Sequence, residues 1–205
     1  MQLGIRFDTA LAYARQAHAG QTRKGTAVPY VAHLLAVAAT VLEYGGDEDL
    51  AIAGLLHDAV EDQGGLPRLA DIRARFGERV ADIVLACSDS QATDGGSKPP
   101  WRQRKLDYLR HLDRAGRDVL LVSLADKVHN ARSILRDLRT AGVGTSVWGR
   151  FNASAADTIA YYAALADTFR RRLPGQLSDE LGEIVAAIAA DTGVPVRPLV
   201  GIGAG

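Results

Sequence analysis

The sequence of 205 residues has a single cysteine, no excess charge of either sign and no long apolar run. With only Cys87, the chain has no internal disulfide framework and no cysteine-rich zinc site. Lysine and arginine together number 24, as do aspartate and glutamate, so no global positive field attracts a nucleic-acid polymer. The length suits one ordinary domain with a substantial core.

Signals for export or for a membrane are also lacking. No run of about 18 uncharged apolar residues occurs, so the sequence predicts no membrane span. The first eight residues, Met1 to Asp8, do not show the charged-then-apolar pattern of a signal peptide. We therefore expect a cytoplasmic protein without a membrane partner.

Apolar residues recur at helical spacing along nearly the whole chain, and no segment alternates with a period of two. This pattern predicts an all-α fold, a compact multi-helix array. We expect one domain over residues 1–191 and a flexible tail over 192–205. The first expected helix has Asp8 or Thr9 near its start and ends near His18. The other helices are expected at residues 30–44, 48–62, 67–76, 78–88, 101–115, 117–138, 148–172 and 178–190, with loops at 20–29, 89–100 and 139–147.

Residues 98–117 form a basic region in this otherwise neutral chain, with seven lysines and arginines against two aspartates. A local cluster of this size favours a small anionic ligand over a polymer. Arg104 lies in the middle of the region. The alternative is a solvated helix face, which is the commoner fate of a charge run.

The most informative stretch runs from Leu55 through His57-Asp58-Ala59-Val60 to Glu61-Asp62. Neighbouring histidine and aspartate side chains can both bind one divalent metal ion. The two acids follow one helical turn later and are expected on the same side of the helix. Four such groups beside apolar leucines are costly to place by accident, so the stretch indicates metal-assisted chemistry.

Two further residues can complete a metal site. His33 lies at the start of the second expected helix, and Asp126 lies in an apolar part of a later one. Two imidazoles and two carboxylates from three helices would form a mononuclear site in a helical core. This mixture of ligands suits Mn²⁺, Fe²⁺, Co²⁺ or Zn²⁺. Taken alone, a histidine such as His33 is more often a hydrogen-bonded surface or core residue, and Asp126 alone could be half of an ion pair.

Three segments in this order resemble the hydrolase domain of the RelA/SpoT-homologue family, within the HD phosphohydrolase superfamily. They are Arg23-Lys24-Gly25 leading to Pro29-Tyr30 and His33, then His57 to Asp62, then Asp126-Lys127-Val128-His129-Asn130. The resemblance covers roughly residues 7–170. The stand-alone members of that family are the small alarmone hydrolases.

The resemblance implies an HD-domain fold and a Mn²⁺-dependent 3′-pyrophosphohydrolase that converts (p)ppGpp to GDP or GTP and pyrophosphate. It implies that Glu61 and Asp62 orient and deprotonate the attacking water. It assigns the metal to four ligands and the nucleotide to residues that flank them. The metal ligands would be His33, His57, Asp58 and Asp126, and the substrate-binding residues Arg23, Lys24 and Asn130, with Lys127 and Arg104 as further candidates.

The sequence departs from the family in two places. Leu34 follows the first histidine, where the family often has proline, and the segment from Asp58 to Asp126 is longer than expected, with the extra length within residues 89–101. Because no synthetase region follows, we expect a hydrolase alone. Two alternatives are a phosphohydrolase of another nucleotide, such as a nucleoside phosphate or NADPH, and a non-catalytic nucleotide sensor. The presence of Glu61 and Asp62 counts against the sensor.

Overall fold

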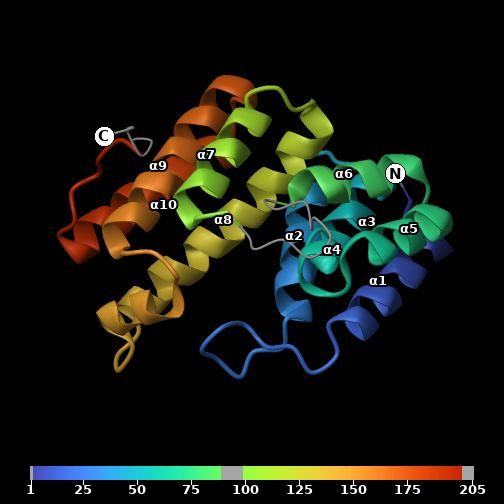
Figure 1. Ribbon diagram of the computed structural model, residues 1–205, viewed down its shortest axis with the longest axis horizontal. Coiled ribbons are helices and arrows are strands. Elements are labelled where there is room, and N and C mark those ends of the chain that lie inside the picture. Colours follow the sequence, from blue (N-terminus) through green and yellow to red (C-terminus); the bar gives the residue numbers. More distant parts are fainter. Residues whose placement is uncertain (1, 89–98, 200–205) are drawn as a thin grey trace. The chain divides into compact units, whose positions relative to one another are not determined.

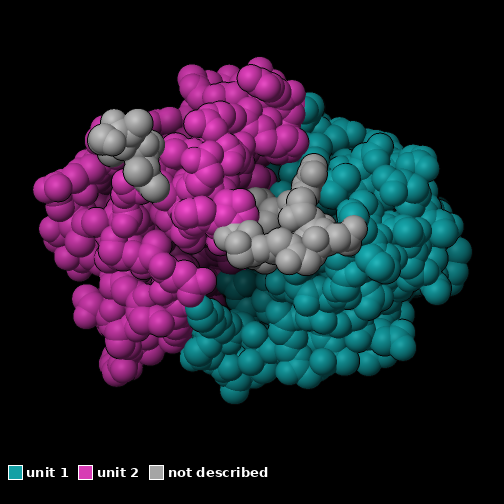
Figure 2. Space-filling view, in the orientation of Figure 1, with its two compact units in different colours: residues 1–98, 116–126 teal, residues 99–115, 127–205 magenta. Residues whose placement is uncertain are grey.

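The computed structural model describes residues 2–88 and 99–199 of the chain. Within these ranges it contains ten α-helices, one 3-10 helix and no strand (Figure 1), which confirms the predicted all-α class. The chain divides into two compact units, coloured separately in Figure 2: residues 1–98 with 116–126, and residues 99–115 with 127–205. The single domain expected over residues 1–191 stays a prediction.

The first unit is built around a helix whose last seven residues are all apolar. All seven residues from Leu50 to Leu56 are buried, and a helix that is apolar all round has to be covered on every side. The helices of this unit are α1 (Ile5–Ala17), α2 (Val31–Glu43), α3 (Glu48–Leu56), α4 (Ala59–Asp62), α5 (Gly65–Phe76), α6 (Glu78–Cys87) and the first part of α8 (Arg117–Arg139).

Helices α2 and α3 approach each other closely at Gly54. A Cβ atom placed on this glycine would lie 3.2 Å from the Cα atom and 3.3 Å from the backbone nitrogen of Ala38. A Cβ atom at this distance would be unusually tight, so a residue without a side chain suits the close spacing of the two backbones. The glycine therefore sets the distance between the helix that carries His33 and the helix that leads to His57.

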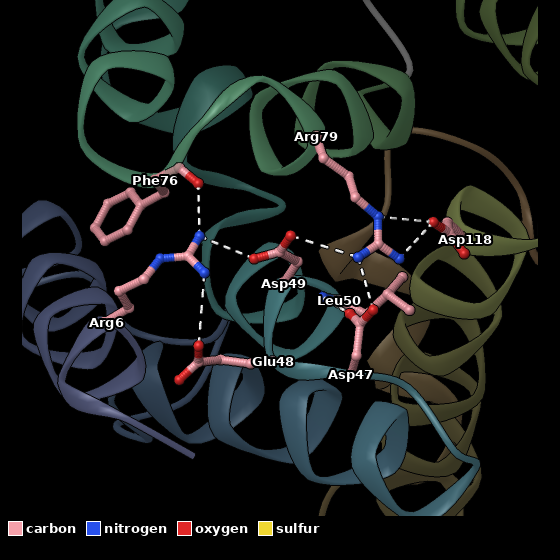
Figure 3. Close-up of polar contacts among 8 residues, drawn as sticks. All are labelled: Arg6, Asp47, Glu48, Asp49, Leu50, Phe76, Arg79 and Asp118. Carbon is pink, nitrogen blue, oxygen red and sulfur yellow. Dashed lines mark hydrogen bonds and ion pairs between the residues drawn. The ribbon is translucent and has the colours of Figure 1, made fainter. Parts of the chain in front are cut away.

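Ion pairs fasten the beginning of α3 to its neighbours (Figure 3). The Asp47 carboxylate caps the helix by accepting a hydrogen bond from the Leu50 backbone nitrogen at 3.0 Å. Arg79 of α6 donates to Asp47 at 2.6 Å and to Asp118 of α8 at 2.8 Å. On the other side of α3, Arg6 of α1 pairs with Asp49 at 2.8 Å. These contacts hold together the helices that surround α3.

The second unit contains α7 (Trp101–Leu112), the remainder of α8, the 3-10 helix η1 (Gly144–Arg150), α9 (Ala155–Arg172) and α10 (Gln176–Thr192). Leu165 and Phe169 of α9 and Leu181 of α10 are fully buried in its core. On the surface, Arg132 of α8 pairs with Glu180 of α10 at 2.6 Å. An exposed pair of this kind adds little stability, so the apolar core holds this unit together.

The single helix expected over residues 48–62 was wrong. Helix α3 ends at Leu56, a turn follows at His57 and Asp58, and the short helix α4 begins at Ala59. The His57 ring bonds the Gly54 carbonyl oxygen at 2.8 Å, and such side-chain bonds compete with the regular backbone ladder. The helix therefore breaks at the residues that carry the candidate ligands.

Two other helix starts also differ from expectation. The helix expected from residue 148 begins only at Ala155, because Ser154 caps it by accepting from the Asp157 backbone nitrogen at 3.0 Å. Helix α1 begins at Ile5, before Asp8, and the preceding Gly4 nitrogen donates to Glu48 of α3 at 2.6 Å.

Residues 89–98 of the expected loop and 200–205 of the expected tail lie outside the described residues. In the part of the chain that is described, no helix is both long and apolar enough to cross a membrane.

Candidate metal centre

Three of the predicted ligands meet at one point of the first unit. Ligand atoms of His33, His57 and Asp58 all lie within 4.8 Å of one another. The Oδ2 atom of Asp58 lies 3.0 Å from Nε2 of His57 and 3.4 Å from Nε2 of His33. Both histidines are buried, and the aspartate is partly open to solvent. The three side chains come from α2 and from the turn between α3 and α4.

The fourth predicted ligand approaches from α8. Asp126 lies outside the tightest group, but its Oδ1 atom is 3.3 Å from Nε2 of His33 and 3.7 Å from Nε2 of His57. Its side chain is buried. The structure therefore brings together two imidazole nitrogens and two carboxylates from distant parts of the sequence.

The hydrogen bond between His57 and Gly54 determines which ring nitrogen faces the carboxylates. Nδ1 lies 2.8 Å from the Gly54 carbonyl oxygen, which can only accept, so Nδ1 must carry a proton. In the neutral ring, Nε2 then presents a lone pair toward Asp58. A backbone carbonyl that holds the far nitrogen of a histidine is the usual support of a metal-binding imidazole.

The charges around His57 and Asp58 favour a positive charge between them. Burial alone would lower the pKa of His57 and raise the pKa of Asp58. The attraction between the two groups, with hydrogen bonds to Asp126 and His33, outweighs burial. The pKa of His57 is therefore well above its ordinary value and the pKa of Asp58 well below. A proton can supply this positive charge, and so can a divalent cation. Carboxylates crowded together away from water need a positive charge between them.

The predicted water-activating acids follow on α4. Asp62 accepts a hydrogen bond from Nε2 of Gln21 at 3.0 Å. Partial loss of water around the carboxylate, together with the negative charge of Asp58, raises the pKa of Asp62 above its ordinary value. A raised pKa makes a carboxylate a better base. Glu61 precedes it on the same helix and is half-buried.

The segment that carries Arg23 and Lys24 folds back on itself beside these residues. Its two arms are joined by backbone bonds from Arg23 to the Val28 carbonyl at 2.8 Å and from Tyr30 to the Gln21 carbonyl at 2.9 Å. Gly25, between the arms, has a φ of 72°, which suits a residue without Cβ. The guanidinium of Arg23 lies 5.7 Å from the centroid of the Tyr30 ring. Lys24 is exposed at the turn.

The other predicted substrate-binding residues belong to the second unit. Arg104 lies on α7, and Lys127 and Asn130 lie on the part of α8 that follows Asp126. The Lys127 ammonium lies 5.2 Å from the centroid of the Tyr108 ring. The roles of these three residues stay predictions.

Sequence analysis gave no role to two side chains that contact the candidate site. The Tyr30 hydroxyl donates to Oδ2 of Asp58 at 2.6 Å, and Gln21 bonds Asp62. Burial and the charge of Asp58 raise the pKa of Tyr30, so its hydroxyl keeps its proton. The available signal was their position on either side of Arg23 and Lys24, which becomes informative only when the turn between them is known.

Comparison with known proteins places this geometry in context. A family model described as "HD domain" matches residues 10–166, which include His33, His57, Asp58 and Asp126. A probable guanosine-3′,5′-bis(diphosphate) 3′-pyrophosphohydrolase of Synechocystis is 35% identical over 130 residues, covering 61% of this chain and 16% of the relative. The pyrophosphohydrolase MESH1 of Xenopus tropicalis is 34% identical over 127 residues, covering 60% of this chain and 66% of the relative.

Two solved structures share the fold. A structure described as a metazoan orthologue of SpoT that hydrolyses ppGpp has a TM-score of 0.66 and 23% identity, over 95% of this chain and 99% of that one. The protein lmo0812 of Listeria monocytogenes has a TM-score of 0.64 and 29% identity, over 76% of this chain and 97% of that one. The matched segment of this chain spans about a sixth of the Synechocystis relative and about two thirds of the Xenopus one.

Proposed function

The chain belongs to the HD-domain family, and we propose that it is a metal-dependent 3′-pyrophosphohydrolase of (p)ppGpp. The products would be pyrophosphate and GDP or GTP. The observation that carries this proposal is the convergence of His33, His57, Asp58 and Asp126 in a chain whose relatives are named for that reaction.

We propose that these four side chains hold one divalent ion and that the ion is Mn²⁺. The set of two imidazoles and two carboxylates fits a first-row divalent metal, and it contains no thiolate that would favour a structural zinc site. Held by these four side chains, a divalent ion would supply positive charge that could polarise a phosphoryl oxygen and favour ionisation of a water.

The chain's own residues supply the rest of the chemistry. Glu61 and Asp62 would orient the attacking water and take its proton, a role that the raised pKa of Asp62 supports. Phosphoryl transfer asks for an in-line nucleophile and neutralised charge rather than covalent help from the protein. Glu61 and Asp62, beside the proposed metal ion, would provide the in-line nucleophile by holding and deprotonating the water.

Recognition of the nucleotide would fall to basic and polar side chains of this chain. Arg23 presents a planar guanidinium that can stack on a purine ring, and Lys24 is a compact partner for phosphate. Asn130, Lys127 and Arg104 are proposed to contact the sugar and phosphates. A small nucleotide, rather than a nucleic-acid polymer or a membrane, is therefore the proposed partner, in a cytoplasmic protein.

The test is a panel of nucleotides incubated with the purified chain and Mn²⁺. Pyrophosphate released from ppGpp and pppGpp, with no orthophosphate, supports the proposal. Orthophosphate released from a nucleoside phosphate or from NADPH would instead favour an HD phosphohydrolase of another nucleotide. Binding of ppGpp without any turnover would identify a sensor.

A further inference from the structure

The folded-back segment formed by residues 20–30, here called the basic turn, contacts the candidate site through both of its arms. Gln21 and Tyr30 face each other at its base, where the Tyr30 backbone nitrogen donates to the Gln21 carbonyl oxygen at 2.9 Å. Thr22 and Pro29 form an antiparallel bridge just above them. The same short segment thus carries Arg23 and Lys24 at its far end and two site-contacting side chains at its base.

Tyr30 fixes the orientation of Asp58. Its hydroxyl donates at 2.6 Å to Oδ2, the same oxygen atom that faces both imidazoles. A bond from a hydroxyl to an ionised carboxylate is short and strong. The tyrosine ring is itself held, because it stacks on the buried His18 ring with centroids 5.0 Å apart and planes 14° apart.

Gln21 holds Asp62 in a corresponding way. Its Nε2 atom donates to Oδ2 of Asp62 at 3.0 Å, while its Oε1 atom accepts from Nε2 of Gln63 at 2.5 Å. Nδ1 of His18 lies 2.7 Å from the same Oε1 atom. Because an ionised carboxylate only accepts, the amide nitrogen must face Asp62, and His18 must then donate through Nδ1. Every polar atom of the Gln21 amide therefore has a partner that fixes it.

We propose that Gln21 and Tyr30 are positioning residues, which set the geometry of the water-activating acid Asp62 and of the metal ligand Asp58, respectively. The basic turn then couples the residues proposed to hold the nucleotide to both halves of the reaction centre. This inference rests on the proposed function for its kinetic part. Its structural part rests on the hydrogen bonds alone.

The variant Tyr30→Phe tests the first half, because it removes the hydroxyl and keeps the ring that stacks on His18. We expect its affinity for Mn²⁺, titrated without nucleotide, to fall by about 10- to 100-fold, as when an outer partner of a metal ligand is removed. The control is Tyr44→Phe, because Tyr44 is a half-buried tyrosine at the C-terminal end of α2. Wild-type affinity in Tyr30→Phe would overturn the assignment of Tyr30.

The variants Gln21→Glu and Gln21→Ala test the second half. Glutamate fills the same space as Gln21, but its carboxylate replaces the Nε2 donor and repels the Asp62 carboxylate. Alanine only removes the hydrogen bond to Asp62. We expect kcat to fall by about tenfold in Gln21→Ala and further in Gln21→Glu, with KM and Mn²⁺ affinity unchanged. A residue that only fills space would give the opposite order, and that order would overturn the assignment. Gln16→Glu on the exposed face of α1 is the matched control.

A spectroscopic measurement separates this inference from the proposed function. In protein labelled with ¹³C at the aspartate carboxyls, the Asp62 resonance is assigned by its loss in Asp62→Asn. It should shift in Gln21→Glu and stay in place in Gln16→Glu. If the wild-type protein cleaves no nucleotide, the proposed function fails. The Mn²⁺ titration of Tyr30→Phe and the Asp62 resonance still decide the roles of the two residues, and an unshifted resonance would reject that of Gln21.

Discussion

His57 shows how one hydrogen bond determines the chemistry that a side chain can offer. The Gly54 carbonyl holds the proton on Nδ1, so in the neutral ring Nε2 is the nitrogen that points a lone pair toward Asp58 and Asp126. Without this support the imidazole could turn or change tautomer. A cation bound at this point satisfies all three groups together.

At the residue scale, we expect His57→Ala and Asp58→Ala to lose the bound metal. Each change removes a donor from a group whose ligand atoms lie within 4.8 Å of one another. Metal content measured by elemental analysis after desalting checks this outcome. His111→Ala, an exposed histidine on α7, should keep the wild-type content. Stoichiometric metal in both site variants would refute the four-ligand assignment.

Glu61→Gln and Asp62→Asn should separate binding from chemistry. Both substitutions keep the shape of the side chain and remove the negative charge that can accept a proton. We expect kcat for ppGpp to fall by about 100- to 10,000-fold in each variant, the range contributed by general acid–base catalysis. Bound Mn²⁺ and the affinity for nucleotide should remain. Turnover at the wild-type rate in both variants would assign the water to other residues.

At the scale of single elements, the close approach of α2 and α3 at Gly54 controls the distance between the two histidines. Alanine is favoured over glycine in a helix interior by about 1 kcal/mol, so propensity alone predicts that Gly54→Ala stabilises the protein. The contact with the backbone of Ala38, at 3.2 Å from the added Cβ, opposes this gain and pushes α2 and α3 apart.

We therefore expect Gly54→Ala to bind Mn²⁺ more weakly than the wild type, as measured by titration. Gly149→Ala is the control, because a Cβ at Gly149 meets no atom within 4 Å. An unchanged metal affinity in Gly54→Ala would show that the two helices can separate without moving His33 and His57.

The cap of α3 predicts a dependence of stability on pH. Burial tends to raise the pKa of Asp47, but the hydrogen bonds from Arg79 and from the Leu50 nitrogen outweigh this and lower the pKa. A carboxylate with a lowered pKa stabilises the folded state at pH values above its unfolded pKa of about 3.9, and this contribution is lost as the pH falls through the folded value.

The variant Asp47→Asn keeps an oxygen that can cap the helix but carries no charge to titrate. It should be less stable than the wild type at pH 7, and the difference should narrow as the pH falls below about 4. Urea unfolding at several pH values measures this difference. Asp167→Asn, at an exposed position of α9, serves as the control. A difference that stays constant from pH 7 to pH 3 would contradict a role for the ion pair with Arg79.

At the scale of the whole molecule, the candidate metal ligands all belong to one unit. A ligand present at 100 times its dissociation constant stabilises the state that binds it by about 2.7 kcal/mol. We expect Mn²⁺ to slow amide hydrogen exchange most in α2, in α3 and in residues 117–126 of α8, which carry or support the ligands. Equal protection of α9 and α10 in the second unit would show that the two units open together.

The sequence predicted the helical class and most helix positions, because apolar periodicity and glycine or aspartate boundaries are local features. The break at His57 and Asp58 was not predictable in this way. It depends on a side-chain bond to Gly54 within a segment whose pattern is continuously helical. The start of α9 was missed although Ser154 and Asp157 provided a capping signal.

The grouping of the predicted ligands was inferred from residue types and their spacing, and the motif resemblance then supported it. His33 and Asp126 are 93 positions apart, and only the packing of α2 and α8 brings their side-chain atoms to 3.3 Å. The contacts of Gln21 and Tyr30 could not be predicted from the sequence. Nothing in the order of residues shows that one turn points these two side chains toward Asp62 and Asp58.

The first unit is discontinuous in sequence, and this sets how much of the chain must be synthesised before all of its parts are present. A nascent chain that ends near residue 115 already carries His33, His57 and Asp58, but it lacks the Asp118 partner of Arg79 and the Asp126 carboxylate. Eleven further residues, 116 to 126, must therefore be added before all four candidate metal ligands are present. Until Asp126 has been added, the chain carries only three of the four candidate ligands.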